Sequence, residues 1–165
     1  MEPERITRTL RRLAYEVVER NRGADTLELF GILRSGAPLA AALAEQINAI
    51  DGGTLSAHDL DVGPFRDDRD APPGPKEAPQ DTVDVSGRDV VLVDDVLFTG
   101  RTARAALDAI VHFGRPRTIQ LLVLIDRGHR EYPIRPDYVG RRLQTKHNEQ
   151  VEVALDEGFA VYVTD

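Results

Sequence analysis

Residues 90–102 read VVLVDDVLFTGRT. The first four side chains are apolar and unbroken by a polar residue, a pattern typical of a strand buried on both faces of a parallel sheet. Asp94 and Asp95 follow that strand, and the turn over 99–102 leads into a predicted helix over 102–113. Ligands of open α/β sheets bind beyond the carboxyl ends of the strands. We therefore expect a binding site around this acidic pair.

The acidic pair and the turn have the chemistry of a sugar-phosphate site. Two adjacent carboxylates can accept hydrogen bonds from the vicinal hydroxyls of a ribose. The turn brings backbone N–H groups, the hydroxyls of Thr99 and Thr102 and a helix N-terminus to one place, where a phosphate would bind. The alternative is that the acids only end a strand and Thr102 only caps a helix. The combination favours the site, because uncompensated carboxylates at the end of an apolar strand are costly.

The rest of the chain surrounds this segment with alternating strands and helices. Apolar residues at helical spacing predict the helices, and short apolar runs predict the strands. This alternation indicates a doubly wound α/β sheet, followed by a small accessory sheet at the end of the chain. The further predicted elements are helices over 3–21 and 38–50, strands over 27–32, 54–62 (weak) and 119–125, and accessory strands over 151–153 and 160–163.

The segment 63–84 differs from its surroundings. It holds half of the ten prolines, many acids and almost no aliphatic side chains, so we expect no packed element from it. Long segments of this kind inside a domain are usually functional or disordered. We interpret it as a mobile flap beside the binding site.

Composition excludes several classes of protein. A chain of 165 residues with 41% hydrophobic and 30% charged residues fits a single domain, residues 1–165. The absence of cysteine excludes disulfide frameworks and thiolate sites, and the charged N-terminal residues are no signal peptide. The net charge of −7 argues against a generic nucleic-acid binder, although the stretches 1–23 and 112–150 are locally basic. We expect a cytoplasmic protein.

Two motifs resemble a known family. Residues 90–102 are similar in all thirteen positions to the phosphoribosyl pyrophosphate (PRPP) motif of type I phosphoribosyltransferases. The string DRGHREYPIRPDYVG over 126–140 resembles, more narrowly, the PyrR family, which joins uracil phosphoribosyltransferase activity to RNA-dependent attenuation of pyrimidine operons. Shorter matches occur at 19–21, 66–68 and 114–116, so the likeness covers nearly the whole chain.

The resemblance implies a fold and an activity. The fold would be a parallel sheet of about five strands flanked by helices, with the flap over 63–84 and a hood over 126–165 above the base. The activity would be formation of UMP and pyrophosphate from uracil and PRPP. Purine members of this fold have a lysine where this chain has Asp126, which favours uracil. The alternatives are an RNA-binding regulator with residual catalysis, and a phosphoribosyltransferase for another base such as a purine.

The resemblance also assigns site residues. Asp94 and Asp95 would hold the ribose hydroxyls, the turn 99–102 the 5′-phosphate, and the turn 33–36 the pyrophosphate. Arg34 and Arg66 would assist the departing pyrophosphate, although Arg66 could equally be a solvated loop charge. Tyr138 could stack on the base or could be an ordinary core residue. The residues expected to bind substrate are Leu33, Arg34, Ser35, Gly36, Asp94, Asp95, Val96, Leu97, Phe98, Thr99, Gly100, Arg101, Thr102, Arg127, Tyr138, Val139 and Val151, and those expected to serve catalysis are Asp94, Asp95, Arg34 and Arg66.

Partners and cofactors follow from the same resemblance. No acid and histidine cluster has the spacing of a protein-made metal site, so we expect Mg²⁺ to arrive chelated by PRPP. A leader RNA would contact Arg8, Arg12, Arg20 and His129. The alternative for these side chains is an ordinary solvated face with i,i+4 ion pairs such as Arg12–Glu16. Family members are commonly dimers or tetramers, so we expect a homodimer or homotetramer.

Overall fold

The computed structural model describes residues 1–67, 83–154 and 158–165. Within these ranges five parallel strands form one sheet in the order β2-β1-β3-β4-β5. The central strand is β3, which carries the decisive segment. The strand bounds are β1 Leu27–Ile32, β2 Ala57–Leu60, β3 Asp89–Leu97, β4 Thr118–Asp126 and β5 Tyr138–Arg142.

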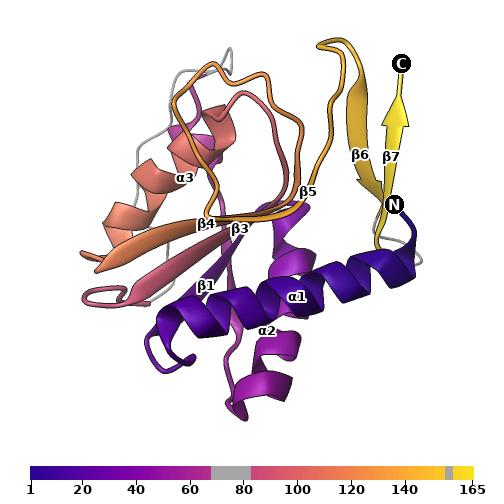
Figure 1. Ribbon diagram of the computed structural model, residues 1–165. Helices are drawn as coiled ribbons and strands as arrows, with labels where there is room; N and C mark the ends of the chain where they lie inside the picture. Colours follow the sequence, from indigo (N-terminus) through magenta and orange to yellow (C-terminus); the bar gives the residue numbers. More distant parts are fainter. Residues whose placement is uncertain (68–82, 155–157) are drawn as a thin grey trace.

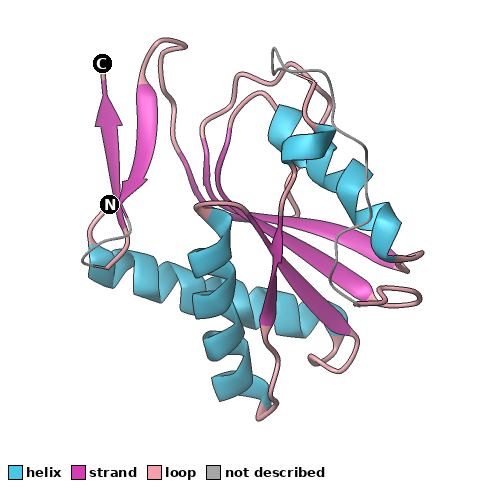
Figure 2. Cartoon of the chain, turned by 180° about the vertical axis from the view of Figure 1, so that it is seen from behind, coloured by secondary structure: helices cyan, strands magenta, loops and turns pink. Residues whose placement is uncertain are grey.

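Helices cover both faces of the sheet, as Figure 2 shows from behind. The helices α1 (Pro3–Asn21) and α2 (Gly36–Asp51) lie on one face, and α3 (Arg101–Ile110) lies on the other. Alternate side chains of β3 serve the two cores: Val91 and Val93 pack with α1 and α2, whereas Val90 and Leu92 pack with α3. The unbroken apolar run is therefore explained by burial on both faces.

A two-stranded antiparallel hairpin stands beside the sheet (Figure 1). It consists of β6 (Gln150–Ala154) and β7 (Ala160–Thr164). The start of β7 lies beside the start of α1, where the amide of Val161 donates to the Met1 carbonyl at 3.0 Å. This hairpin is the predicted accessory sheet.

The α/β class, the parallel sheet and most elements are confirmed. The first helix and the first strand have the predicted bounds, and α2 begins two residues earlier than expected. The weak second strand is shorter than predicted, and the last helix ends at Ile110, followed by a 3₁₀ turn, η2, over Val111–Phe113.

The central strand differs from the prediction in a way that matters for the site. It does not end at Val93 but continues through the acidic pair to Leu97. Asp94 is paired in register with Val123, and Val96 with Ile125. The two carboxylates are therefore held by sheet geometry rather than by a loop.

Two further predictions need correction. The edge strand β5 was not expected, because its sequence YVGRR contains a glycine and two arginines in place of an apolar run. The segment 63–84 was expected to give no packed element, yet Gly63–Phe65 forms a 3₁₀ turn, η1, and Phe65 is only 4% exposed beside α3. Most of the proposed flap, residues 68–82, lies outside the described residues.

A buried aspartate fastens the sheet at the end opposite the acidic pair. Asp89 is 3% exposed and accepts hydrogen bonds from the hydroxyls of Thr26 at 2.7 Å and Thr118 at 2.8 Å. Both carboxylate oxygens also accept hydrogen bonds from Arg117: Oδ1 from Nε at 3.1 Å, and Oδ2 from Nη2. These bonds lower the pKa of Asp89, the arginine contributing most. One carboxylate thus ties β3 to the strands on either side of it.

Among the described residues, no helix combines the length and apolar character that crossing a membrane requires.

Candidate functional site

The main cavity, of about 370 Å³, lies where β3 ends and α3 begins. It brings together residues that are far apart in the sequence, because Arg66 joins the segment that runs from the acidic pair into the helix. Nine of the predicted site residues share this cavity. Its lining is Arg66, Asp94, Val96, Leu97, Phe98, Thr99, Gly100, Arg101, Thr102, Ala103 and Glu131.

The turn at this cavity has the geometry of an anion site. Gly100 is the N-cap of α3 and has a φ of 89°, in the left-handed region that favours glycine. A Cβ there would lie 3.0 Å from the side chain of Ile134, so the turn also needs the missing side chain for space. Gly100 has no side chain to cap this helix, and the Thr99 hydroxyl accepts from the Arg101 amide at 3.3 Å. The helix N-terminus therefore faces the cavity with its positive dipole end.

The acidic pair is partly buried and self-organised. The Asp95 amide donates to an Asp94 carboxylate oxygen at 2.9 Å, and the Val96 amide donates to Asp95 at 2.7 Å. Burial and the neighbouring Asp95 charge raise the pKa of Asp94 well above its ordinary value, while Arg66 opposes that rise. Two close carboxylates with a cation nearby form a strong acceptor site for hydroxyl groups.

Arginine side chains at the cavity play two different parts. Arg66 donates from Nη1 to the Thr102 hydroxyl at 3.0 Å, so it lies at the mouth of the cavity. The Arg101 guanidinium instead donates to Glu131 at 2.7 Å and to the Tyr132 hydroxyl at 2.8 Å. Arg101 is predicted to bind phosphate. Its guanidinium is bonded to Glu131 and Tyr132, so only its backbone, at the start of α3, faces the cavity as part of the turn.

The turn over 33–36 lies against the same end of β3. A Cβ on Gly36 would fall 2.3 Å from the Val93 carbonyl oxygen, so the backbones approach as closely as glycine allows. The Leu33–Arg34 peptide bond is cis, and both of its side chains are exposed.

A second cavity, also of about 370 Å³, lies between this turn and the hairpin. It brings together Ser35, Asp95 and Val151, three of the predicted substrate residues. The remaining lining residues come from the hairpin and are Glu152, Val153, Ala154 and Tyr162. The hairpin thus faces the second carboxylate of the pair.

Arg127 is a buried arginine that joins the loop after β4 to the segment 143–149. Its guanidinium carbon lies 4.1 Å from the centre of the Phe98 ring, a cation–π arrangement. It donates to the Thr145 hydroxyl at 3.1 Å and to the Lys146 carbonyl at 3.0 Å. With His129 it lines a cavity of about 400 Å³.

Tyr138 is not brought together with these residues. It is 3% exposed in the core between the sheet and α1, and its hydroxyl donates to Gln120 at 2.6 Å. This placement agrees with the alternative, an ordinary core tyrosine. The next residue, Val139, is partly buried, and its carbonyl accepts from Arg12 at 3.2 Å.

The residues predicted to meet RNA are engaged within the chain. Arg8 lies 3.6 Å from Glu4, and Arg12 lies 2.5 Å from Glu16, the i,i+4 pairs of an ordinary helix face. Arg20 pairs with Asp137 at 2.9 Å. A ring nitrogen of His129 lies 2.7 Å from the Thr145 carbonyl oxygen, and its ring contacts Phe98 and His147.

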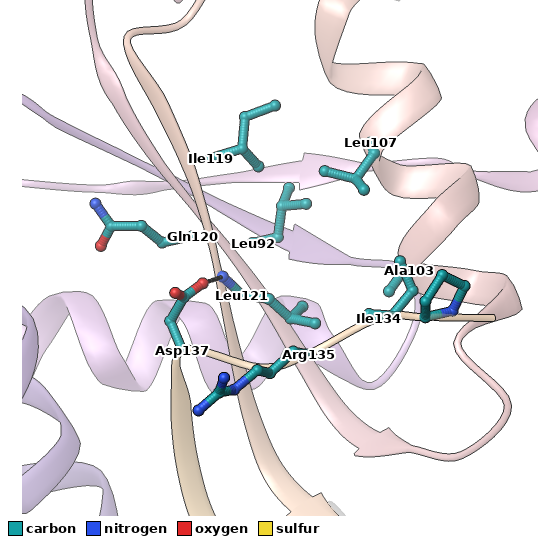
Figure 3. A pocket seen from close by; sticks show the side chains of 10 residues that line it. Leu92, Ala103, Leu107, Ile119, Gln120, Leu121, Ile134, Arg135 and Asp137 are labelled. Carbon is teal, nitrogen blue, oxygen red and sulfur yellow. Dashed lines mark hydrogen bonds between the residues drawn. The ribbon is translucent and has the colours of Figure 1, made fainter. Parts of the chain in front are cut away.

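A smaller hollow of about 210 Å³ lies behind the turn 99–102, between β4 and α3 (Figure 3). Its floor is apolar, from Leu92 and Leu121, and Ala103 lines both this hollow and the main cavity. At its rim the Asp137 carboxylate accepts from the Leu121 amide at 2.8 Å, which fixes the chain just before β5.

Sequence reasoning missed Asp67, Glu131 and Tyr132, which surround the Arg101 side chain. The Tyr132 hydroxyl donates to Asp67 at 2.7 Å across 65 residues of sequence. Nothing in the local pattern of either residue indicates this contact, which depends on the folded arrangement. In the described ranges, no group of three or more acidic, histidine or cysteine side chains is placed to hold a metal ion.

Comparisons with known proteins agree on one family. A family model described as "Phosphoribosyl transferase domain" matches residues 2–157. A "Bifunctional protein PyrR" from Pelotomaculum thermopropionicum is 50% identical over 159 residues, which cover 95% of this chain and 88% of that protein. A "Pyrimidine operon regulatory protein" from Lactococcus lactis subsp. cremoris is 47% identical over 156 residues, covering 92% and 86% of the two chains.

Solved structures show the same fold at lower sequence identity. The hypoxanthine phosphoribosyltransferase of Trypanosoma cruzi superposes with a TM-score of 0.69 at 19% identity, over 92% of this chain and 82% of that one. A hypoxanthine phosphoribosyltransferase from Staphylococcus aureus gives a TM-score of 0.67 at 19% identity, over 88% and 77% of the chains. The expected type I phosphoribosyltransferase fold is confirmed.

Proposed function

Because the chain belongs to the PyrR family of phosphoribosyltransferases, we propose that it forms UMP and pyrophosphate from uracil and PRPP. The observation that carries the proposal is that Asp94 of the acidic pair shares one cavity with the turn 99–102 and the N-terminus of α3, while Asp95 faces the adjoining cavity beside the hairpin. This arrangement matches a substrate that carries two vicinal hydroxyls and a phosphate a few ångströms apart.

In this proposal each part of PRPP meets one part of the site. Asp94 and Asp95 accept from the ribose hydroxyls, and the turn 99–102 receives the 5′-phosphate through backbone N–H groups and hydroxyls. The turn 33–36 and the side chains of Arg34 and Arg66 lie toward the pyrophosphate. Mg²⁺ belongs to the substrate as the Mg²⁺–PRPP complex, and it neutralises charge on the leaving pyrophosphate.

The reaction needs no strong protein nucleophile. A ring nitrogen of uracil attacks C1 of the ribose while the bond from C1 to the pyrophosphate oxygen breaks, and the nitrogen loses its proton. The carbon passes through a state with oxocarbenium character, so the protein contributes by holding the reactants in line and by offsetting charge. The carboxylates below the ring would stabilise the positive charge that develops on it.

The base would lie between the main cavity and the hood. We assign the hood to residues 126–165 within a single domain 1–165, and we place Arg127, the Val139 backbone and Val151 on the base side. Asp126 is held by the Arg130 guanidinium at 2.8 Å, so an acceptor stands where purine members have a lysine. This difference supports uracil over a purine.

The test is incubation with labelled PRPP, Mg²⁺ and a panel of uracil, hypoxanthine, guanine and orotate. We expect nucleotide from uracil alone. Product from a purine would replace the uracil assignment, and no product from any base despite UMP binding would favour a regulator with residual catalysis. The double substitution Asp94→Asn and Asp95→Asn should weaken PRPP binding at least about tenfold, because two charge-assisted acceptors are lost. Asp59→Asn, on an exposed strand position, is the matched control.

We further propose that the protein binds a pyrimidine-operon leader RNA, a proposal supported by its similarity to a pyrimidine operon regulatory protein. Arg8, Arg12, Arg20 and His129 are the proposed contacts. Arg8 is the cleanest probe, since its side chain is 80% exposed and pairs only loosely with Glu4. Arg8→Ala should weaken retention of leader RNA in filter binding and reduce the salt dependence by about one phosphate contact. UMP synthesis should not change, and matched losses in both assays would contradict the separation of the two surfaces.

The same proposal includes a cytoplasmic location and a homodimeric or homotetrameric state. Light scattering of the purified protein measures the assembly directly.

A further inference from the structure

Tyr132 places its hydroxyl between opposite charges beside the main cavity. It donates to the Asp67 carboxylate at 2.7 Å and accepts from Arg101 Nη1 at 2.8 Å. The Arg101 guanidinium carbon also lies 4.7 Å from the centre of the tyrosine ring. One hydroxyl thus joins the segment before residue 68 to the start of α3.

The tyrosine is itself fixed to the phosphate turn. The amides of Glu131 and Tyr132 both donate to the Thr99 carbonyl, at 2.9 and 3.0 Å. The Glu131 carboxylate accepts from Arg101 Nε at 2.7 Å. Tyr132 is therefore fixed relative to the turn 99–102. Asp67, which accepts from the tyrosine hydroxyl, is fixed relative to the same turn.

The two chain neighbours of Arg66, Phe65 and Asp67, are both held by contacts within the protein. On one side Phe65 is 4% exposed in the core beside α3, and its carbonyl accepts from Arg104 at 3.3 Å. On the other side Asp67 is held by Tyr132 and by Arg101, which lies 3.3 Å away. The hydrogen bond from the tyrosine and the nearby arginines lower the pKa of Asp67, so this carboxylate is charged at neutral pH.

We propose that Tyr132, through Asp67, is a positioning residue that holds Arg66 at the mouth of the phosphate cavity. The inference rests on the proposed function, since Arg66 is taken to meet PRPP. It assigns a role in the reaction to two residues outside the cavity lining. The competing account is that Phe65 and the hydrogen bond from Arg66 to Thr102 position the arginine by themselves, in which case the tyrosine hydroxyl has no effect on substrate.

Tyr132→Phe removes the hydroxyl and keeps the ring, so the protein should fold normally. We expect the Kd and KM for Mg²⁺–PRPP to rise about fivefold, the size of one lost hydrogen bond, with the KM for uracil unchanged. Tyr15→Phe, a half-exposed tyrosine on α1, is the matched control and should leave all values unchanged. Asp67→Asn is the second variant: it keeps an acceptor for the tyrosine but loses the charge, and we expect a smaller rise in the same constant.

A double-mutant cycle with Arg66→Ala shows whether the effect passes through the arginine. Tyr132→Phe should have no further effect on PRPP affinity in the Arg66→Ala background. A second, independent readout is the pH dependence of PRPP binding. Arg66 holds down the pKa of Asp94, so displacing it should move the acidic limb of the binding profile to higher pH.

The outcomes separate the two levels of the argument. If the unmodified protein does not bind PRPP, the proposed function fails and the positioning role fails with it. If the unmodified protein binds PRPP but Tyr132→Phe binds equally well, or if its effect persists unchanged without Arg66, the positioning role alone is wrong. A selective loss that vanishes in the Arg66→Ala background supports it.

Discussion

Asp89→Asn is expected to destabilise the protein measurably while leaving the cavity at the opposite end of β3 unchanged. Asp89 is 3% exposed, and its carboxylate accepts from two hydroxyls and from Nε and Nη2 of Arg117. An asparagine keeps one oxygen, which can still serve Thr118 and one arginine nitrogen. Its amide nitrogen meets the second arginine nitrogen, donor against donor. At least one charge-assisted bond in a buried position is therefore lost.

The magnitude follows from that count. One buried hydrogen bond to a charged group contributes about 1.5–3 kcal/mol. For a chain of this length each kcal/mol shifts the melting temperature by about 2–4 °C, so a loss of about 2 kcal/mol lowers it by about 4–8 °C. Differential scanning calorimetry at pH 7 measures this shift. Asp25→Asn, an exposed aspartate at the same end of the sheet, should change the melting temperature little.

The pH dependence gives a second check with a definite sign. The pKa of Asp89 in the folded protein lies below its ordinary unfolded value of about 3.9. The stabilisation is therefore complete above about pH 5 and is lost as the pH falls below that value. The gap between wild type and Asp89→Asn should be constant from pH 6 to 8 and should shrink by pH 3. A variant that melts within about 1 °C of wild type at pH 7, or a gap that stays constant down to pH 3, would refute the reasoning.

Three further changes probe the site itself. Gly36→Ala should weaken PRPP binding more than about tenfold in calorimetric titration, because the new Cβ would lie 2.3 Å from the Val93 carbonyl oxygen. Gly53→Ala is the control and should leave binding unchanged, since its Cβ would lie 3.7 Å from the nearest atom, Asn48 Oδ1. Asp95→Asn removes the like charge that raises the pKa of Asp94, so the acidic limb of the PRPP-binding profile should move to lower pH; a limb that stays fixed would exclude this coupling. Arg127→Lys loses the planar stack on an aromatic ring at 4.1 Å and should raise the KM for uracil more than that for PRPP, and an equal rise in both would contradict a place on the base side.

Much of the frame could be predicted because it depends on short-range patterns. The helix over 3–21 carries its own periodicity and forms where expected, and the run 90–93 lies within the central strand, which is longer than expected. Asp94 and the turn after it could be assigned to one cavity because residues close in sequence at a strand end must lie together, whereas Asp95 faces a second cavity that the hairpin completes.

The rest depends on contacts that no local pattern records. Within the described parts of the chain, the edge strand Tyr138–Arg142 is paired on one side only, and its sequence has no apolar alternation to reveal it. Tyr138 belongs to the core because its hydroxyl finds Gln120, a polar partner buried at 3% exposure. The contact between Asp67 and Tyr132 is set by tertiary structure alone.

The reach of Arg12 across to β5 has a practical consequence. Its Nη2 donates to the Val139 and Gly140 carbonyls, at 3.2 and 2.8 Å, on a strand with no neighbour beyond it among the described residues. Bare acceptors on such a strand invite a strand from another molecule, the first step of aggregation. Truncating Arg12 would remove a donor from that edge, so a loss of soluble protein could imitate a loss of RNA affinity. A lysine at this position would keep a donor within reach of the edge.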